Sequence, residues 1–227
     1  MSEHHSGRRI TTRMYLGAAV LCTDAVTGRA PSTPITVIWV DGGKRFRRTP
    51  SGHFVVTDLP ADLAELTVDI RGGGRYLNSS VTIDKFGTIS NPIDSSYEAA
   101  EVLLYPAPSY PFDRGATLVR GSINANGEPV EAAECWIEMT GDNPPTFEAE
   151  GRSDPRGEYV LPVRGIGPAD VTQAYQDGTA VDGRKLVHVD GGQPTVVVKH
   201  PDTGEIREQS VVVPEGDTVQ LDFSFSL

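Results

Sequence analysis

The sequence has little cysteine, little positive charge and no long apolar run. Its 227 residues include two cysteines, Cys22 and Cys135, which lie far apart in the chain. So few cysteines argue against a disulfide framework. We expect two buried free thiols instead, because free cysteine is commonly a core residue.

Positive charge is scarce, since 31 Asp and Glu outnumber 20 Lys and Arg and leave a net charge of −11. Nucleic-acid binding needs clustered Lys and Arg against phosphate, so we expect no nucleic-acid partner. The five histidines show no metal-ligand spacing such as H-E-x-x-H, and neither G-x-S-x-G nor a phosphate loop is present. We therefore expect no catalytic residues, no metal, no cofactor and no small-molecule ligand.

No apolar run approaches the roughly 20 residues that a membrane-spanning helix needs, so we expect no membrane insertion. The stretch "MYLGAAVLC" (14–22) follows several arginines and resembles the short hydrophobic core of a signal peptide. The same stretch matches the opening strand of a second repeat, described below, and its removal would delete part of a domain. We therefore expect cytoplasmic synthesis without a cleaved signal peptide.

Glycine (24) and proline (17) are abundant, and short apolar or alternating segments are separated by turn residues every 8–12 positions. No segment keeps a helical period. Alternation is clear over residues 133–139, where one face would hold Ala133, Cys135, Ile137 and Met139, and the other Glu134, Trp136 and Glu138. This pattern predicts an all-β chain of antiparallel sandwiches.

The chain also contains a repeated sequence motif. It reads "RRTPSGHFVVT" around Gly52 and "RSDPRGEYVL" around Gly157, 105 residues later. Each copy has a glycine shortly before an aromatic residue that is expected to begin a strand. An earlier turn in each half contains Gly28 or Gly127. These four glycines are predicted to define the turns of a duplicated fold, because glycine accepts a positive φ.

The duplication predicts four segments. They are a flexible N-terminal arm (1–13), a first sandwich (14–105), a proline-rich linker (106–115) and a second sandwich (116–227). The linker lies within the stretch "YPAPSYPFDRGA" (105–116) and contains several prolines, which stiffen the chain. A plain spacer and a fixed angle between domains both remain open.

The second half carries a resemblance to a known family. "GSINANGEPVEAAECWIEM", followed by "GRSDPRGEYVLPV", resembles the carboxypeptidase regulatory-like domain, which is close to transthyretin-like and collagen-adhesin B-type sandwiches. The resemblance implies two tandem Ig-like or prealbumin-like sandwiches, and it implies no chemistry. Tandem sandwiches joined by "YPFDRGATLVRG" also resemble small accessory proteins of phage-tail-like contractile injection systems.

Partner binding is predicted at an outward-facing tryptophan and at the basic residues of an acidic chain. These residues are Trp136, Lys44, Arg45, Arg47, Arg48, Arg8 and Arg9. Trp39, on the equivalent strand of the first half, is predicted to face inward. Trp136 has two other interpretations, stacking on a sugar ring or packing against the linker or the other domain. The basic run could be a solvated loop.

These features predict a non-enzymatic structural or adaptor protein. Its expected partners are other proteins, either copies of itself or subunits of a contractile particle, into which it would be incorporated and with which it would be released. Two alternatives remain open. One is a cell-surface carbohydrate-binding or adhesin module, and the other is a transthyretin-like hydrolase with His, Arg and Ser gathered in one cleft.

Overall fold

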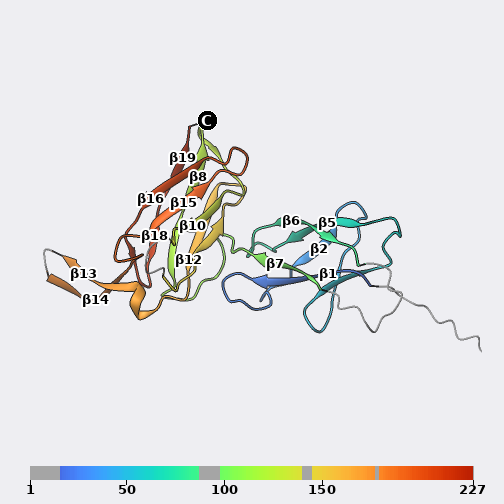
Figure 1. Cartoon of the computed structure of the whole chain (residues 1–227), viewed down its shortest axis with the longest axis horizontal. Helices are drawn as coiled ribbons and strands as arrows, with labels where there is room; N and C mark the ends of the chain where they lie inside the picture. The colour runs from blue at the N-terminus through green and yellow to red at the C-terminus, as the bar shows by residue number, and fades with distance from the viewer. Residues whose placement is uncertain (1–15, 87–97, 140–144, 177–178, 227) are drawn as a thin grey trace, which may run out of the picture. The chain divides into compact units, whose positions relative to one another are not determined.

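The computed structural model describes residues 16–86, 98–139, 145–176 and 179–226, and these residues form an all-β protein (Figure 1). The one helical segment among them is a single 3-10 turn, Pro168–Asp170. The predicted fold class, two tandem antiparallel β-sandwiches, is confirmed.

Two compact units divide the described chain. The first contains the residues up to Cys22 together with Thr36–Ile70 and Ser79–Val102, and the second contains Thr23–Ile35, Arg71–Asn78 and the residues from Leu103 onward. The domain boundaries inferred from the sequence stay predictions.

Seven strands lie in the described part of the first repeat. They are β1 (Leu16–Asp24), β2 (Thr36–Trp39), β3 (Arg47–Arg48), β4 (Phe54–Thr57), β5 (Glu65–Arg71), β6 (Ser79–Asp84) and β7 (Ala100–Leu104). One sheet has the order β3-β4-β1-β7 and the other the order β2-β5-β6. Alternate residues of β4 and β5 are buried, as the period of two in a strand requires.

The described residues of the second repeat form twelve strands. They are β8 (Thr117–Ala125), β9 (Glu128–Pro129), β10 (Glu134–Ile137), β11 (Glu150–Arg152), β12 (Glu158–Val163), β13 (Val171–Gln176), β14 (Thr179–Val187), β15 (Thr195–Lys199), β16 (Ile206–Ser210), β17 (Val213–Pro214), β18 (Thr218–Gln220) and β19 (Phe223–Phe225). The two main sheets contain β12-β8-β18 and β11-β10-β15-β16.

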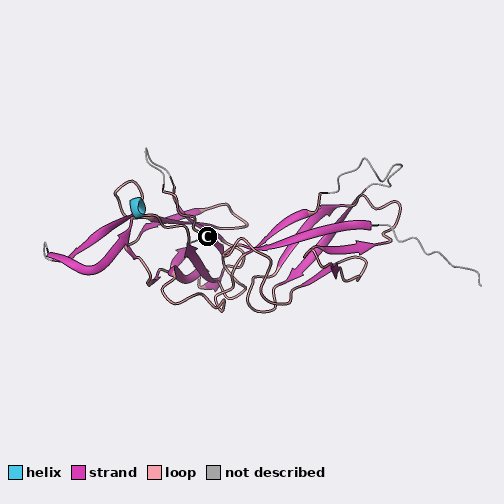
Figure 2. Ribbon diagram, turned by 90° about the horizontal axis from the view of Figure 1, so that it is seen from below, coloured by secondary structure: helices cyan, strands magenta, loops and turns pink. Residues whose placement is uncertain are grey.

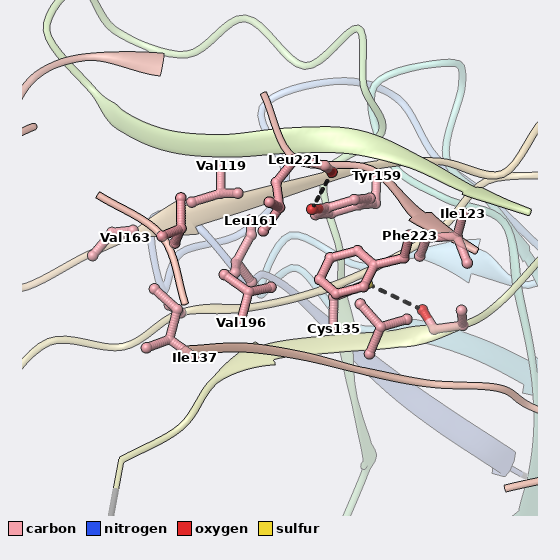
Figure 3. Packing of buried hydrophobic residues seen from close by; sticks show 14 of the residues in the cluster. Val119, Ile123, Cys135, Ile137, Tyr159, Leu161, Val163, Val196, Leu221 and Phe223 are labelled. Carbon is pink, nitrogen blue, oxygen red and sulfur yellow. Dashed lines mark hydrogen bonds between the residues drawn. The ribbon is translucent and has the colours of Figure 1, made fainter. Parts of the chain in front are cut away.

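A hydrophobic core fills the space between these two sheets (Figure 3). Leu161 and Tyr159 come from one sheet, Cys135 and Val196 from the other, and all four are at most 2% exposed. Burial of such a side chain stabilises the fold by roughly 1.5–3 kcal/mol. The Tyr159 hydroxyl donates to the carbonyl of Leu221 at 2.8 Å, so the one polar atom of this ring is satisfied.

The repeated glycine corners have the same hydrogen bonds in both halves. In the first, Gly52 N donates to Thr49 O at 3.0 Å. In the second, Gly157 N donates to Asp154 O at 2.8 Å. Each pair of positions is related by the same 105-residue offset, so the sequence duplication is also a duplication of backbone structure.

Two features of the second repeat lie outside the sequence prediction. The last strands, β18 and β19, pair with β8 in parallel, whereas β12 pairs with β8, and β10 with β11 and β15, in antiparallel fashion. In addition, β13 and β14 form a hairpin that extends away from the second sandwich (Figure 2). The short strand β17 pairs with β14 of this hairpin.

Candidate protein-binding surfaces

Trp136 lies on the outer face of the sheet β11-β10-β15-β16. In the strand register it is opposite Glu150 of β11 and Val197 of β15, and Val197 is opposite Glu208 of β16. The preceding residue, Cys135, faces the core. Trp136 is therefore the centre of a row that crosses four strands, and its side chain is half-buried. We call this surface the Trp136 face.

A row of charged side chains borders Trp136 on the same face. Glu134 is opposite both Arg152 and Lys199. Its carboxylate oxygens lie 3.3 Å from Arg152 Nη2 and 3.8 Å from Lys199 Nζ. These side chains are 44–47% exposed, so the pairs add little stability and mainly fix the rim of the face.

A hollow of about 220 Å³ opens beside Trp136, and its lining includes Tyr105, Glu150 and Arg152. The Arg152 guanidinium lies 5.3 Å from the centre of the Tyr105 ring, within the range of a cation–π contact. Burial raises the pKa of Tyr105, and the negative charge of Glu150 raises it further. Tyr105 is consequently a neutral phenol at physiological pH.

Three carboxylates of the Trp136 face lack a basic partner. Glu138, Glu150 and Glu208 have no Lys, Arg or His within ion-pair distance among the described residues. Glu150 and Glu208 are exposed and lie in the same row as Trp136, Glu150 on the adjacent strand and Glu208 two strands away. Carboxylates therefore outnumber basic side chains around this indole, which favours a cationic group as its contact.

The basic run of the first unit forms a second surface, the basic hairpin, defined by Lys44, Arg45, Arg47 and Arg48. All four are exposed, whereas Phe46 between them is buried. None of the four has a carboxylate within ion-pair distance in the part of the chain that the structure describes. This hairpin is therefore a region of unneutralised positive charge in an acidic protein.

Local contacts hold part of this hairpin in place. Lys44 Nζ donates to the carbonyl of Asp58 at 3.2 Å, and the Arg48 guanidinium lies 5.9 Å from the Phe54 ring centre. Arg45 and Arg47 have no such side-chain contact among the described residues. They are consequently the two cations most available to a partner.

Arg8 and Arg9 lie outside the described residues. Their assignment to partner binding stays a prediction, as does that of Trp136 and the basic hairpin. The four predicted turn glycines all have positive φ, at +65° for Gly28, +89° for Gly52, +88° for Gly127 and +73° for Gly157.

The two cysteines are free and buried, as expected. Burial raises the pKa of Cys22 to about 12, against a smaller lowering by the Arg48 charge, so its thiol is protonated at physiological pH. Burial also raises the pKa of Cys135. Neither thiol is a candidate nucleophile.

The described histidines make local contacts to turns. His200 is buried, its Nδ1 lies 3.2 Å from the Asp202 amide nitrogen, and its ring contacts Phe225. His53 Nδ1 is 3.1 Å from the Ser51 hydroxyl in the corner that contains Gly52. Among the described residues, no group of three His, Cys, Asp or Glu could hold a metal ion.

A buried carboxylate that the sequence does not indicate ties the linker to neighbouring loops. Asp24 Oδ2 accepts hydrogen bonds from the hydroxyls of Tyr76 and Tyr110, each at 2.8 Å, and Oδ1 accepts from Val26 N at 2.7 Å. Burial raises the pKa of Tyr110, and the hydrogen bond to Asp24 raises it further. Nothing local in the sequence indicates this cluster, since its members lie far apart.

The β13–β14 hairpin was also missed. At its base, Asp170 accepts from the Thr146 hydroxyl at 2.7 Å and from Gly167 N at 2.8 Å. Burial alone would raise the pKa of Asp170, but these hydrogen bonds outweigh burial and lower it. The Asp-Gly dipeptide at 177–178, between two segments of moderate β-propensity, was the available hairpin signal.

The sequence matches no protein-family model and none of the curated proteins compared with it. Among solved structures, the chain is similar to the Bacillus anthracis TIE protein, with 11% identity and a TM-score of 0.27 over 92% of this chain and 33% of that one. This chain thus spans about a third of that protein's length.

A double mutant of the shaft pilin SpaA from Lactobacillus rhamnosus GG is also similar, with 10% identity and a TM-score of 0.21 over 93% of this chain and 98% of that one. Both TM-scores are too low to support an argument about function. A search of the described residues for a helix long and apolar enough to span a membrane finds none.

Proposed function

We propose that this protein is a non-enzymatic structural or adaptor protein whose exposed surfaces bind other proteins. The basic hairpin is the observation that carries the proposal. Four exposed cations without an acidic partner among the described residues stand in a chain of net charge −11. Unpaired charge of the minority sign gives a partner both a specific contact and electrostatic steering.

The Trp136 face supports the same function by different chemistry. Tryptophan and arginine are enriched among the residues that dominate binding energy at protein interfaces. Trp136 is held half-buried by its neighbours, so little side-chain freedom is lost when a partner covers it.

The finer proposal is that the partners are subunits of a phage-tail-like contractile injection particle. It is supported by the sequence resemblance at the linker and by the tandem sandwich architecture. In such a particle the protein would be made in the cytoplasm and incorporated during assembly.

Light scattering of the full chain, alone and mixed with the products of neighbouring genes, tests both proposals. We expect a stable complex with at least one neighbour. Trp136→Ala should weaken that complex about 30-fold, which corresponds to roughly 2 kcal/mol at an interface anchor. A chain that stays monomeric and binds none of those products would contradict both.

Carbohydrate binding is the second candidate, favoured by the hollow beside Trp136. An aromatic ring can stack on a sugar, and carboxylates at its edge can accept hydrogen bonds from the sugar hydroxyls. A glycan array tests this candidate. Specific binding that is lost in Trp136→Ala and kept in Arg45→Glu would select it over the adaptor function.

A further inference from the structure

We infer that the basic hairpin of one copy binds the Trp136 face of a second copy, so that the chain assembles with itself head to tail. The inference rests on the proposed function as a protein-binding module and identifies one partner. It follows from two unlike surfaces, one with unpaired positive charge and the other with unpaired negative charge.

The cations of the basic hairpin point outward together. Arg45 bridges Ile38 and Arg47 is opposite Val55, while Phe46 between them is buried. Because side chains alternate along an extended segment, Arg45 and Arg47 share the side away from the core. Their Cα atoms are expected to lie about 7 Å apart, which is two residues of strand.

The Trp136 face matches this pair in chemistry, and its groups lie within the reach of two arginine side chains. Glu150 and Trp136 lie on adjacent strands, about 5 Å apart, and Glu208 lies two further strands away. One guanidinium can stack on the indole while the other reaches a carboxylate. Arginine suits both contacts, because its planar group stacks on aromatic rings and forms paired hydrogen bonds with carboxylates.

Other occupants fit this pair of surfaces less well. An acidic protein partner could meet the hairpin but would be repelled by the Trp136 face, and a basic partner would have the opposite difficulty. A second copy satisfies both surfaces at once and neutralises free charges on each side of the contact. Because the two surfaces are different, the contact is heterologous and each copy keeps one open end, which gives rings or open chains.

Sedimentation velocity of the full chain tests the inference. We expect concentration-dependent association at about 0.1 M salt that weakens at about 1 M, where the Debye length falls from roughly 10 Å to 3 Å. The double variant Arg45→Glu with Arg47→Glu should weaken association at least tenfold. The control, Arg71→Glu with Arg75→Glu, changes two other exposed arginines by the same total charge and should associate about as wild type does.

A charge swap gives the decisive result. Glu150→Lys with Glu208→Lys makes the Trp136 face basic, and this variant should also fail to associate alone. Mixed with the Arg45→Glu and Arg47→Glu variant, it should assemble again, because each reversed surface then meets its complement on the other chain. Recovery on mixing excludes loss of folding as the cause of either defect.

A wild-type chain that stays monomeric at every concentration would overturn the inference, and so would variants that do not recover on mixing. If the monomer still binds a neighbouring gene product, and the Arg45 and Arg47 reversals abolish that binding, self-assembly is excluded and the adaptor function is retained. If the monomer binds no such product, self-assembly and the adaptor function are both excluded.

Discussion

The two sandwiches place a tryptophan on equivalent strands and turn it in opposite directions. Trp39 ends β2 and is 7% exposed in the core, whereas Trp136 of β10 is half-buried on the outer face. Both strands share the same alternation of burial, and the tryptophans differ in position by one residue. A shift of one residue in a strand moves a side chain from core to surface, so the duplicated fold gained a candidate binding face without a change of backbone.

The glycine corners differ in a related way. Gly52 and Gly157 both have positive φ, yet a Cβ on Gly52 would have no atom within 4 Å. A Cβ on Gly157 would lie 2.4 Å from the carbonyl oxygen of Ile123. The corner is therefore set by local conformation alone in the first repeat, and by conformation and close packing in the second.

The largest expected effect separates the tryptophans. Trp39→Ala should lower the free energy of unfolding by about 3–5 kcal/mol, because it leaves a cavity in the core. Trp136→Ala should lower it by about 1 kcal/mol, because part of that side chain is already in water and its removal leaves no enclosed cavity. Urea denaturation followed by circular dichroism measures both, and equal losses would contradict the assignment of one tryptophan to the core and one to the surface.

The glycine comparison gives the next effect. Gly157→Ala should cost about 3 kcal/mol, since it combines positive φ with a backbone clash. Gly52→Ala should cost about 1 kcal/mol, from conformation alone. Thermal unfolding of the two variants under the same conditions tests this order, and a larger loss for Gly52→Ala would reverse our explanation of the corners.

A smaller effect is expected at the buried carboxylate. Tyr110→Phe removes one hydrogen bond to Asp24 and should cost about 1.5 kcal/mol, in the range for a bond to a charged group. It should also speed proteolysis within 107–115, because Ala107 and Tyr110 are only 9% exposed in the wild type. Tyr105→Phe, a tyrosine without a contact to Asp24 in the described hydrogen bonds, serves as the control. Unchanged cleavage in Tyr110→Phe would show that this bond does not hold the linker.

The smallest effect is confined to acid. The lowered pKa of Asp170 means that its ionised form stabilises the folded state above the unfolded carboxyl pKa of about 3.9, and this stability is lost as the pH falls through the folded pKa. Between pH 7 and pH 3, the melting temperature of Asp170→Asn should therefore fall by less than that of the wild type. Asp84→Asn, exposed on β6 of the first repeat, is the matched control. Equal acid sensitivity in Asp170→Asn and wild type would exclude this role.

Much of the fold could be predicted because its signals are local. Alternation over 133–139 places Cys135 and Ile137 in the core, and the structure confirms both. The inward position of Trp39 is confirmed for the same reason. The β13–β14 hairpin was missed because its residues show no strong apolar alternation.

The candidate site could be predicted only in part. Trp136 was selected from the phase of its strand, and the basic run from its composition. Their surroundings were not accessible to such reasoning, because Glu150 and Glu208 join Trp136 through strand pairing across the sheet. Arg48 was grouped with Arg45 and Arg47, although the structure places it over Phe54.

The sequence by itself determined the all-β class, the duplication and the glycine corners. These features depend on residue spacing and on the backbone freedom of glycine, which act within a few residues. Only the tertiary structure decided which charges remain unpaired and which buried groups meet. Asp24 contacts Tyr76 and Tyr110 at separations of 52 and 86 residues, and contacts at such distances along the chain leave no periodic trace in a single sequence.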